Sequence, residues 1–585
     1  MTFWDWSIIA AYGLAVLVFG MVLARKAASS SEEYFLSGRR LTWYVLGLSL
    51  VATSFAADTP LAVTEIVRTQ GIWGNWIWWI WALSHVLAIF LFSRLWRRAE
   101  VTTDAEFIER RYQGRSAAVL RAVKAAVMGL GFNLFIMGWV TQAMGTIFSA
   151  TLDMDKDLAL GLCALVAIVY TTASGLWGVV VSDVFQFAVA MVGAFLFAGY
   201  AVHAAGGLSA VAAKAESLHK LSVLPPQSAL DSSKFLILLS IGWLATHNAD
   251  AGGYTMQRLS AAKNERHAVG GSILFVLCHY VLRVWPWILV ALASLVLLPN
   301  LTDHKAAYPL LIMRVLPTGL KGLLVASLLA AYMSTIDTHL NWGASYLVTD
   351  IYQRFWHKDA DERSLIRAAR ISSVGLALAA LLVSRSIDSI KGAWTLLYSM
   401  GAGLGPALIL RWFWWRVTAQ AELAAMLLSL VAGALLSALG LAYEFRLAAV
   451  FGLGLFTTVL VSLATGRKVT RHLEAFYDRV RPGGLWGPVA KGRPGILNRG
   501  ILVDVLAGVA VVYGLGLGIG KMLFSQWSQA GILLAAAATG GIVLWMRRDS
   551  FVTQSPSESS ASPLPEPSPV PASSEPSSTS SSPPR

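Results

Sequence analysis

The sequence predicts an all-α integral membrane protein with about fifteen transmembrane helices, and three observations support this fold class. Hydrophobic residues make up 56% of the 585 residues, and charged residues make up only 14%. The mean hydropathy is +0.60, which excludes a soluble globular class. About fifteen apolar runs of roughly 17 to 30 residues are each long enough to cross a hydrocarbon core of about 30 Å.

The apolar runs define the expected spans in chain order. They are residues 6–25, 43–66, 74–95, 119–150, 157–176, 182–203, 234–257, 268–298, 319–350, 368–385, 391–411, 420–441, 446–464, 502–522 and 528–546. The first run is expected to remain as an outward-starting helix, because Asp5 precedes it and Arg25 and Lys26 follow it, the reverse of a signal peptide. From residue 551 the chain is rich in Ser and Pro, which predicts a disordered tail.

Basic residues cluster in alternate loops, and this pattern predicts the orientation of the chain. The basic set includes residues 94–111, 258–266, 354–370 and 467–499, whereas the intervening loops are short or poor in Lys and Arg. We therefore expect a multi-pass protein of the plasma (inner) membrane with its N-terminus outside and its C-terminus in the cytoplasm. These loops also account for the net charge of +13. We therefore expect the basic residues to face the lipid bilayer, and we expect no nucleic-acid partner.

The segment 330–341 carries hydroxyls, a carboxylate and amides inside one of the expected spans. At helical spacing Ala331, Ser334, Thr335 and Thr338 share one face, and Asp337 lies beside them. A carboxylate within a spanning helix is costly and points to an ion or a partner residue as compensation. Hydroxyl and carboxylate oxygens suit a hard cation. The segment therefore predicts part of a cation site.

Two expected spans contain interruptions at corresponding places. Residues 54–60 read SFAADTP and residues 246–253 read THNADAGG, so each combines small residues, a carboxylate, and a proline or paired glycines. Such segments suit unwound backbone that lines a water-filled cavity, and in transporters paired broken helices mark the binding site. The alternative is that both are small-residue helix contacts with satisfied polar groups.

Four segments together resemble the sodium:solute symporter family, which includes sodium/proline, sodium/sugar and sodium/sialic acid symporters. They are EYFLSGRR (33–40) leading into GLSLVATS (47–54), TTASGLWGVVVSDVFQ (171–186), LPTGLKGL (316–323) through residue 341, and DIY (350–352). The similarity spans roughly residues 1–465. It implies a LeuT-type fold in which five helices are repeated with inverted topology, here spans two to six and seven to eleven.

The resemblance also implies an organisation along the chain. Residues 1–42 would hold the first helix and a cytoplasmic loop, 43–203 the first repeat, and 204–416 an extracellular loop and the second repeat. Residues 417–550 would add further helices, and 551–585 would form a disordered cytoplasmic tail.

The resemblance further implies the sodium ligands. In the principal site these are the carbonyls of Ala52, Phe55 and Ala331 and the hydroxyls of Ser334 and Thr335. Some family members have a second sodium position, whose matching ligands here would be Asp183, Ser334, Asp337 and Thr338. Asp337 replaces a hydroxyl found in those members, so it could strengthen the site, pair with a basic group or bind a proton. Asp183 could alternatively be a helix cap.

The solute pocket departs from that of the sugar-transporting members. Trp78 and Trp81 stand where those members have polar residues, which disfavours a sugar and offers ring faces to an apolar or cationic solute. The alternative for these tryptophans is an interfacial aromatic belt. Further candidate solute contacts are Asn248, Asp250 and Tyr398. Arg283 could bind a solute carboxylate, or it could neutralise Asp250 or Asp58.

The function expected from these features is sodium-coupled symport by alternating access, importing an amino acid, organic acid or amine more readily than a sugar. One or two sodium ions would be co-transported, and no catalytic chemistry, organic cofactor or obligatory protein partner is expected. The alternative is a transporter-like membrane sensor that signals through a separate partner. A channel is disfavoured, because no selectivity sequence is visible.

Overall fold

Every regular element in the described part of the chain is helical. The computed structural model describes residues 1–552 except 28, 227–228 and 467, so from residue 553 onward the expected disordered tail lies outside the described residues. The first helix and the first expected repeat comprise α1 (Phe3–Ala27), α2 (Ser31–Leu36), α3 (Trp43–Thr53), α4 (Asp58–Thr69), α5 (Trp76–Trp79), α6 (Trp81–Leu87), α7 (Ser93–Ala99), α8 (Glu106–Arg111), α9 (Arg115–Ala126), α10 (Asn133–Leu152) and α11 (Lys156–Ala204).

The rest of the chain continues as helices. The second expected repeat comprises α12 (Leu208–Ser217), α13 (Ala229–Ile241), α14 (Tyr254–Ala261), α15 (Glu265–Leu277), α16 (Val284–Leu297), α17 (Ala307–Val315), α18 (Leu320–Ser345), α19 (Glu362–Ser384), α20 (Ile390–Gly401) and α21 (Leu404–Phe413). The C-terminal helices are α22 (Ala419–Ala438), α23 (Tyr443–Thr465), α24 (Arg471–Val480), α25 (Gly487–Ala490), α26 (Arg499–Leu523), α27 (Trp527–Met546) and α28 (Arg548–Val552). Wide π-type turns join α6 to α7, α9 to α10 and α15 to α16, and another extends α18 to Trp356.

The described residues contain ten helices that are long and apolar enough to cross a membrane, or twelve if each of two bent pairs counts as one span. The predicted total of fifteen therefore stays a prediction. The expected spans 157–176 and 182–203 fall within α11 and adjoin at Gly175, where the chain turns with φ 53° and ψ −162°. A positive φ of this kind is readily adopted only by glycine, so the short loop expected between the two spans is reduced to a single residue.

Both predicted interruptions are present. Helices α3 and α4 are separated by residues 54–57 and bend by 58°. Helices α13 and α14 are separated by residues 242–253, which form turns. A third interruption, a bend of 46°, lies between α20 and α21, where the sequence reads GAGLGP. It was not expected from the sequence. These breaks expose backbone carbonyls and amides in the middle of the helical bundle.

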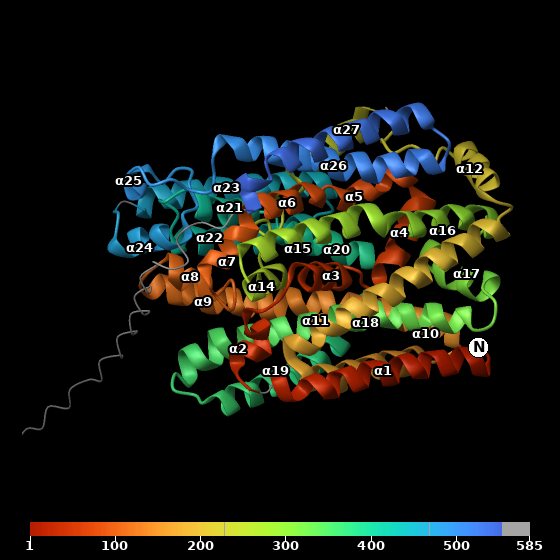
Figure 1. Cartoon of the computed structure of the whole chain (residues 1–585), viewed down its shortest axis with the longest axis horizontal. Helices are drawn as coiled ribbons and strands as arrows, with labels where there is room; N and C mark the ends of the chain where they lie inside the picture. Colours follow the sequence, from red (N-terminus) through yellow and green to blue (C-terminus); the bar gives the residue numbers. More distant parts are fainter. Residues whose placement is uncertain (28, 227–228, 467, 553–585) are drawn as a thin grey trace, which may run out of the picture.

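Helix α18 lies at the centre of the molecule and α27 at its edge. In α18 and its extension, 94% of the most apolar 18-residue stretch is buried inside the protein, against 17% for α27. Figure 1 shows α1, α11, α18 and α10 side by side, with the pair α26 and α27 on the opposite flank. The N-terminus lies at the end of the molecule that holds α12 and α17, and α8, α24 and α25 lie at the other end (Figure 1).

Asp5 fixes the start of α18 to the first helix. Its Oδ1 accepts hydrogen bonds from the backbone amides of Gly319 (2.8 Å), the residue just before α18, and Gly322 (3.0 Å) in the first turn of α18. A carboxylate at this position satisfies amides that have no partner within the helix and complements the helix dipole. The central helix is thereby held in register with α1.

Candidate functional site

The interruption between α3 and α4 lies against α18 and brings together oxygens from both halves. The hydroxyl of Thr335 lies 2.8 Å from the carbonyl of Thr53 and 3.1 Å from the carbonyl of Ala331, and it can donate to either. Just beyond the end of α3, the amide of Phe55 donates to the carbonyl of Ala52 at 3.0 Å. The predicted ligands Ala52, Phe55, Ala331 and Thr335 thus belong to one junction. Thr53 was missed, because its neighbours matched the family pattern and its own carbonyl did not stand out.

Asp183 joins this junction from α11. Its Oδ1 accepts a 2.5 Å hydrogen bond from the hydroxyl of Ser334, and its Oδ2 accepts one of 2.5 Å from Ser49 on α3. The residue is fully buried and lies eight positions after the turn at Gly175, inside a helix and not at its start. The helix-cap interpretation of Asp183 is therefore corrected. The carboxylate positions a predicted sodium ligand.

A guanidinium reaches the ligands expected for a second sodium ion. Arg258 on α14 donates to Thr338 Oγ1 (2.5 Å), Thr53 Oγ1 (3.2 Å) and Ser49 Oγ (3.0 Å), and its Nη2 lies 3.7 Å from Asp183 Oδ2. Arg258 was expected in a cytoplasmic basic loop, but the structure buries it completely. The sequence signal for this burial was its position, five residues after the Gly252-Gly253 break and eight residues before Arg266.

The last predicted ion ligand, Asp337, is fully buried on α18. It lies within electrostatic range of Tyr12 on α1, whereas Thr338, one residue later, contacts Arg258. Whether Asp337 strengthens an ion site, pairs with a basic group or binds a proton stays a prediction.

A cavity of about 170 Å³ opens beside the predicted sodium ligands. Both Thr53 and Thr335 contribute to its wall, so a solute in the cavity would lie next to the cation site. The structure also brings five of the six predicted solute contacts to this wall. They are Trp78, Trp81, Asn248, Arg283 and Tyr398.

The tryptophans lie in the cavity wall and not in an interfacial belt. The ring of Trp81 packs against that of Tyr398 with centroids 4.4 Å apart. Trp78 is buried, stacks on Tyr280 at 6.1 Å, and donates its indole N–H to Asn75 Oδ1 at 3.0 Å. These contacts fix the aromatic side of the cavity.

Asp250 does not line the cavity, and its predicted role as a solute contact is corrected. Its carboxylate forms an ion pair with Arg411 on α21 (2.7 Å) and accepts the indole N–H of Trp412 (2.8 Å). Asn248, two residues earlier in the same turn, does line the cavity and accepts a 2.7 Å hydrogen bond from Thr246. The irregular backbone between α13 and α14, with φ 58° at Ala251, separates the two side chains.

Several cavity residues were not singled out from the sequence. Asp58 was noted only as part of the first interruption and as a partner for Arg283. The remaining ones are His85, His247, His279, His339, Tyr254, Trp139 and Trp394. Isolated histidines and aromatics within apolar spans carry no spacing signal, because their convergence depends on how the helices pack.

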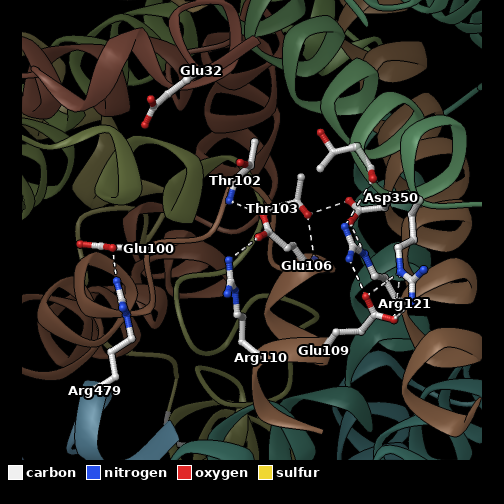
Figure 2. Close-up of polar contacts among 12 residues, drawn as sticks. Glu32, Glu100, Thr102, Thr103, Glu106, Glu109, Arg110, Arg121, Asp350 and Arg479 are labelled. Carbon is white, nitrogen blue, oxygen red and sulfur yellow. Dashed lines mark hydrogen bonds and ion pairs between the residues drawn. The ribbon is translucent and has the colours of Figure 1, made fainter. Parts of the chain in front are cut away.

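A network of charged residues ties the two halves together at the end of the molecule opposite the N-terminus. Asp350, in the extension of α18, accepts hydrogen bonds from Thr103 (2.6 Å) and Arg121 (2.7 Å), as Figure 2 shows. Glu109 on α8 binds both Arg121 (2.6 Å) and Arg354 (2.9 Å). Burial tends to raise the pKa of Glu109, but the hydrogen bond from Arg354 and the charge of Arg121 lower it overall. This carboxylate is therefore held in its charged form.

The chain is similar to known proteins in sequence and in fold. The model of the sodium:solute symporter family matches residues 34–429. The chain is 26% identical over 471 residues to sodium/myo-inositol cotransporter 2 of Mus musculus, covering 73% of this chain and 69% of that protein. It is 24% identical over 498 residues to the sodium/glucose cotransporter of Vibrio parahaemolyticus, covering 80% of this chain and 90% of that one.

Solved structures show the same fold. A sodium-coupled sialic acid symporter in a substrate-bound outward-open state superposes with a TM-score of 0.69 at 18% identity, covering 80% of this chain and 99% of that one. A nucleobase-cation-symport-1 family transporter gives a TM-score of 0.50 at 13% identity, covering 77% and 99%. The predicted all-α, LeuT-type 5+5 inverted repeat is thereby confirmed as the fold class, in a multi-pass membrane protein that is a transporter and not an enzyme. The chain belongs to the sodium:solute symporter family.

Proposed function

We propose that this protein imports a small polar organic solute together with sodium by alternating access. The observation that carries the proposal is the junction at the first helix break, where the Thr335 hydroxyl meets the carbonyls of Thr53 and Ala331. Neutral hydroxyl and carbonyl oxygens drawn from two helices suit a hard monovalent cation.

Coupling follows from the position of these oxygens. The carbonyl of Thr53 lies at the end of α3, whereas the hydroxyl of Thr335 belongs to the central helix α18. A cation bound between them would hold the first helix break against α18 and would set the shape of the adjoining cavity wall. Solute affinity would then depend on sodium, and by reciprocity sodium affinity would depend on solute.

We propose that a single sodium ion is used. Arg258 already supplies a positive charge to Thr338 and Asp183, the ligands expected for a second ion. A cation placed there would have to displace this guanidinium or bear its repulsion at close range. The structural support for the single-ion proposal is the 2.5 Å contact between Arg258 and Thr338.

For the solute, we propose an amino acid, an organic acid or an amine in preference to a sugar. The wall of the cavity combines Trp78, Trp81 and Tyr398 with the ionisable groups Asp58 and Arg283. Sugars carry no charge, whereas this wall adds two ionisable groups to its ring faces and hydroxyls. The named relatives are sodium/myo-inositol and sodium/glucose cotransporters, so both of these solutes belong in any test.

The proposal is tested by uptake into proteoliposomes that contain the purified chain. An inward sodium gradient should drive accumulation of a solute from a panel of amino acids, organic acids, amines, glucose and myo-inositol, and an equal potassium gradient should not. Binding of a solute without any sodium-driven accumulation would contradict symport and would favour the sensor alternative.

A further inference from the structure

Within the part of the chain that the structure describes, two ionic side chains in the cavity wall each have a polar atom without a hydrogen-bond partner. Asp58, in the first turn of α4, is 2% exposed, and its Oδ1 is buried without a hydrogen bond. Arg283, at the start of α16, is 1% exposed, and its Nη1 is buried without one. Within the described residues no carboxylate lies within 4.0 Å of Arg283, so the ion pair with Asp58 or Asp250 that the sequence offered is not formed.

Arg283 is held in place by His279 and by the rings of Trp287 and Phe55. Its Nη2 lies 2.9 Å from His279 Nε2, its Nε donates to the carbonyl of His279 at 3.3 Å, and the guanidinium lies 5.2 Å from the ring centroid of Trp287. These contacts fix the orientation of the side chain and leave Nη1 available. A guanidinium in this state is suited to a carboxylate oxygen.

Asp58 shares the wall with several aromatic rings. Trp81 and Tyr398 are in contact, and His247 stacks on Tyr398 with centroids 6.4 Å apart. Ring faces next to a carboxylate make a favourable environment for an organic cation, because the ring quadrupole and the carboxylate attract the same charge.

The start of α4 also favours a carboxylate at Asp58, because the amides of a first helical turn carry partial positive charge. This explains why Asp58 is tolerated. Arg283 feels the charge of Asp58 only at a distance, because within the described residues no carboxylate forms a salt bridge with it. Two buried charges that do not meet each other are costly, and a ligand that contacts both would remove the cost at each end.

We propose that the cavity binds a zwitterionic solute, an organic molecule with one carboxylate and one ammonium group. The carboxylate would bind Nη1 of Arg283, and the ammonium group would lie beside Asp58 against the aromatic wall. This inference rests on the proposed function, because it names the solute class of the same site.

The test is solute binding to the purified full chain in lipid nanodiscs with sodium present, measured by calorimetry. The probes are the standard amino acids and glycine betaine, together with glucose and myo-inositol. The tightest-binding zwitterion is then compared with two analogues, one in which an amide replaces the carboxylate and one that lacks the ammonium group.

We expect a zwitterion to bind tightest and each analogue to bind at least about tenfold more weakly, because each loses one charge-assisted contact. In Arg283→Gln the amide analogue should bind about as well as the zwitterion, and Arg283→Lys should retain part of the discrimination. In Asp58→Asn the analogue without an ammonium group should no longer be disfavoured. Arg314→Gln, which alters an arginine outside the cavity, is the matched control and should behave as wild type.

Tightest binding of glucose or myo-inositol, or of either single-charge analogue, would overturn the inference. The comparison of analogues on the wild-type chain keeps the test decisive if a variant does not fold. Sodium-driven uptake of a sugar would contradict a zwitterionic solute but would still support symport. Sodium-independent binding of a zwitterion would support the solute class and contradict symport.

Discussion

The hydroxyl of Thr335 lies 2.8 Å from the carbonyl of Thr53, a residue 282 positions earlier in the chain. This contact joins the central helix of the second half to the break in the first helix of the first half. Both residues also line the proposed solute cavity. A cation bound at this junction would therefore contact the two structural halves and the solute compartment at once.

Replacing Ser334 by alanine should weaken sodium activation of transport more than it weakens folding. The change removes one proposed ligand oxygen and the 2.5 Å hydrogen bond to Asp183, and it introduces a good helix former. We expect the half-saturating sodium concentration to rise about tenfold. Ser327→Ala is the matched control, because Ser327 lies on the same helix and its hydroxyl bonds only the backbone of Leu324. Equal sodium dependence in the two variants would remove Ser334 from the site.

Asp183→Asn should destabilise the protein and slow transport. The substitution leaves the buried guanidinium of Arg258 without its counter-charge, and breaking a buried pair in this way costs about 3–5 kcal/mol. The double variant Asp183→Asn with Arg258→Gln should recover much of the lost thermal stability, since no unpaired charge remains. Thermal unfolding in detergent measures both effects. A single variant that melts at the wild-type temperature would show that the pair contributes nothing to stability.

Tyr398→Ala should raise the half-saturating solute concentration and leave sodium binding without solute nearly unchanged. The ring packs on Trp81 at 4.4 Å in the cavity wall, and Tyr398 is not among the proposed sodium ligands. Asn248→Ala should act in the same direction. Tyr352→Ala, which removes a tyrosine outside the cavity, serves as the control. Solute affinity that is indifferent to both cavity substitutions would place the solute elsewhere.

Arg411→Gln should lower stability without changing the solute affinity of the folded protein. It leaves Asp250 and Glu422 buried without their shared cation, at a cost of about 3–5 kcal/mol. Melting temperature and solute binding are measured on the same preparation. Normal stability with lost solute affinity would instead support the solute role that the sequence suggested for Asp250.

The fold class and the residues of the proposed cation junction were accessible from the sequence for different reasons. Hydropathy reports how long each helix is, and the two interruptions at 54–60 and 246–253 carry proline and glycine signals that mark broken helices. The hydroxyl face of α18 was visible from helical spacing alone. By contrast, the pairing of Asp250 with Arg411 depends on the irregular turn before α14, and no periodicity specifies which way such a side chain points.

The solute cavity was predicted only in part. Trp78, Trp81 and Tyr398 stood out because of a tryptophan-rich stretch and a family motif. By contrast, His85 on α6, His247 in the turn before α14 and His279 in the π-type turn before α16 are single residues on separate segments. Arg258 was not predicted as a site residue, because it lies near a basic loop and the positive-inside rule already explained its charge. Each miss concerns a residue whose role depends on contacts between distant helices.

The most direct test of the account is equilibrium binding of radioactive sodium to the purified chain in nanodiscs, comparing wild type, Thr335→Val and Thr64→Val. Thr64 is a buried threonine on α4 whose hydroxyl bonds the carbonyl of Pro60, so its replacement controls for loss of a hydroxyl alone. The account predicts saturable binding of one ion per chain, weakened about tenfold in Thr335→Val and unchanged in Thr64→Val. Absence of saturable binding, or equal affinity in Thr335→Val and wild type, would contradict a sodium site at the first helix break.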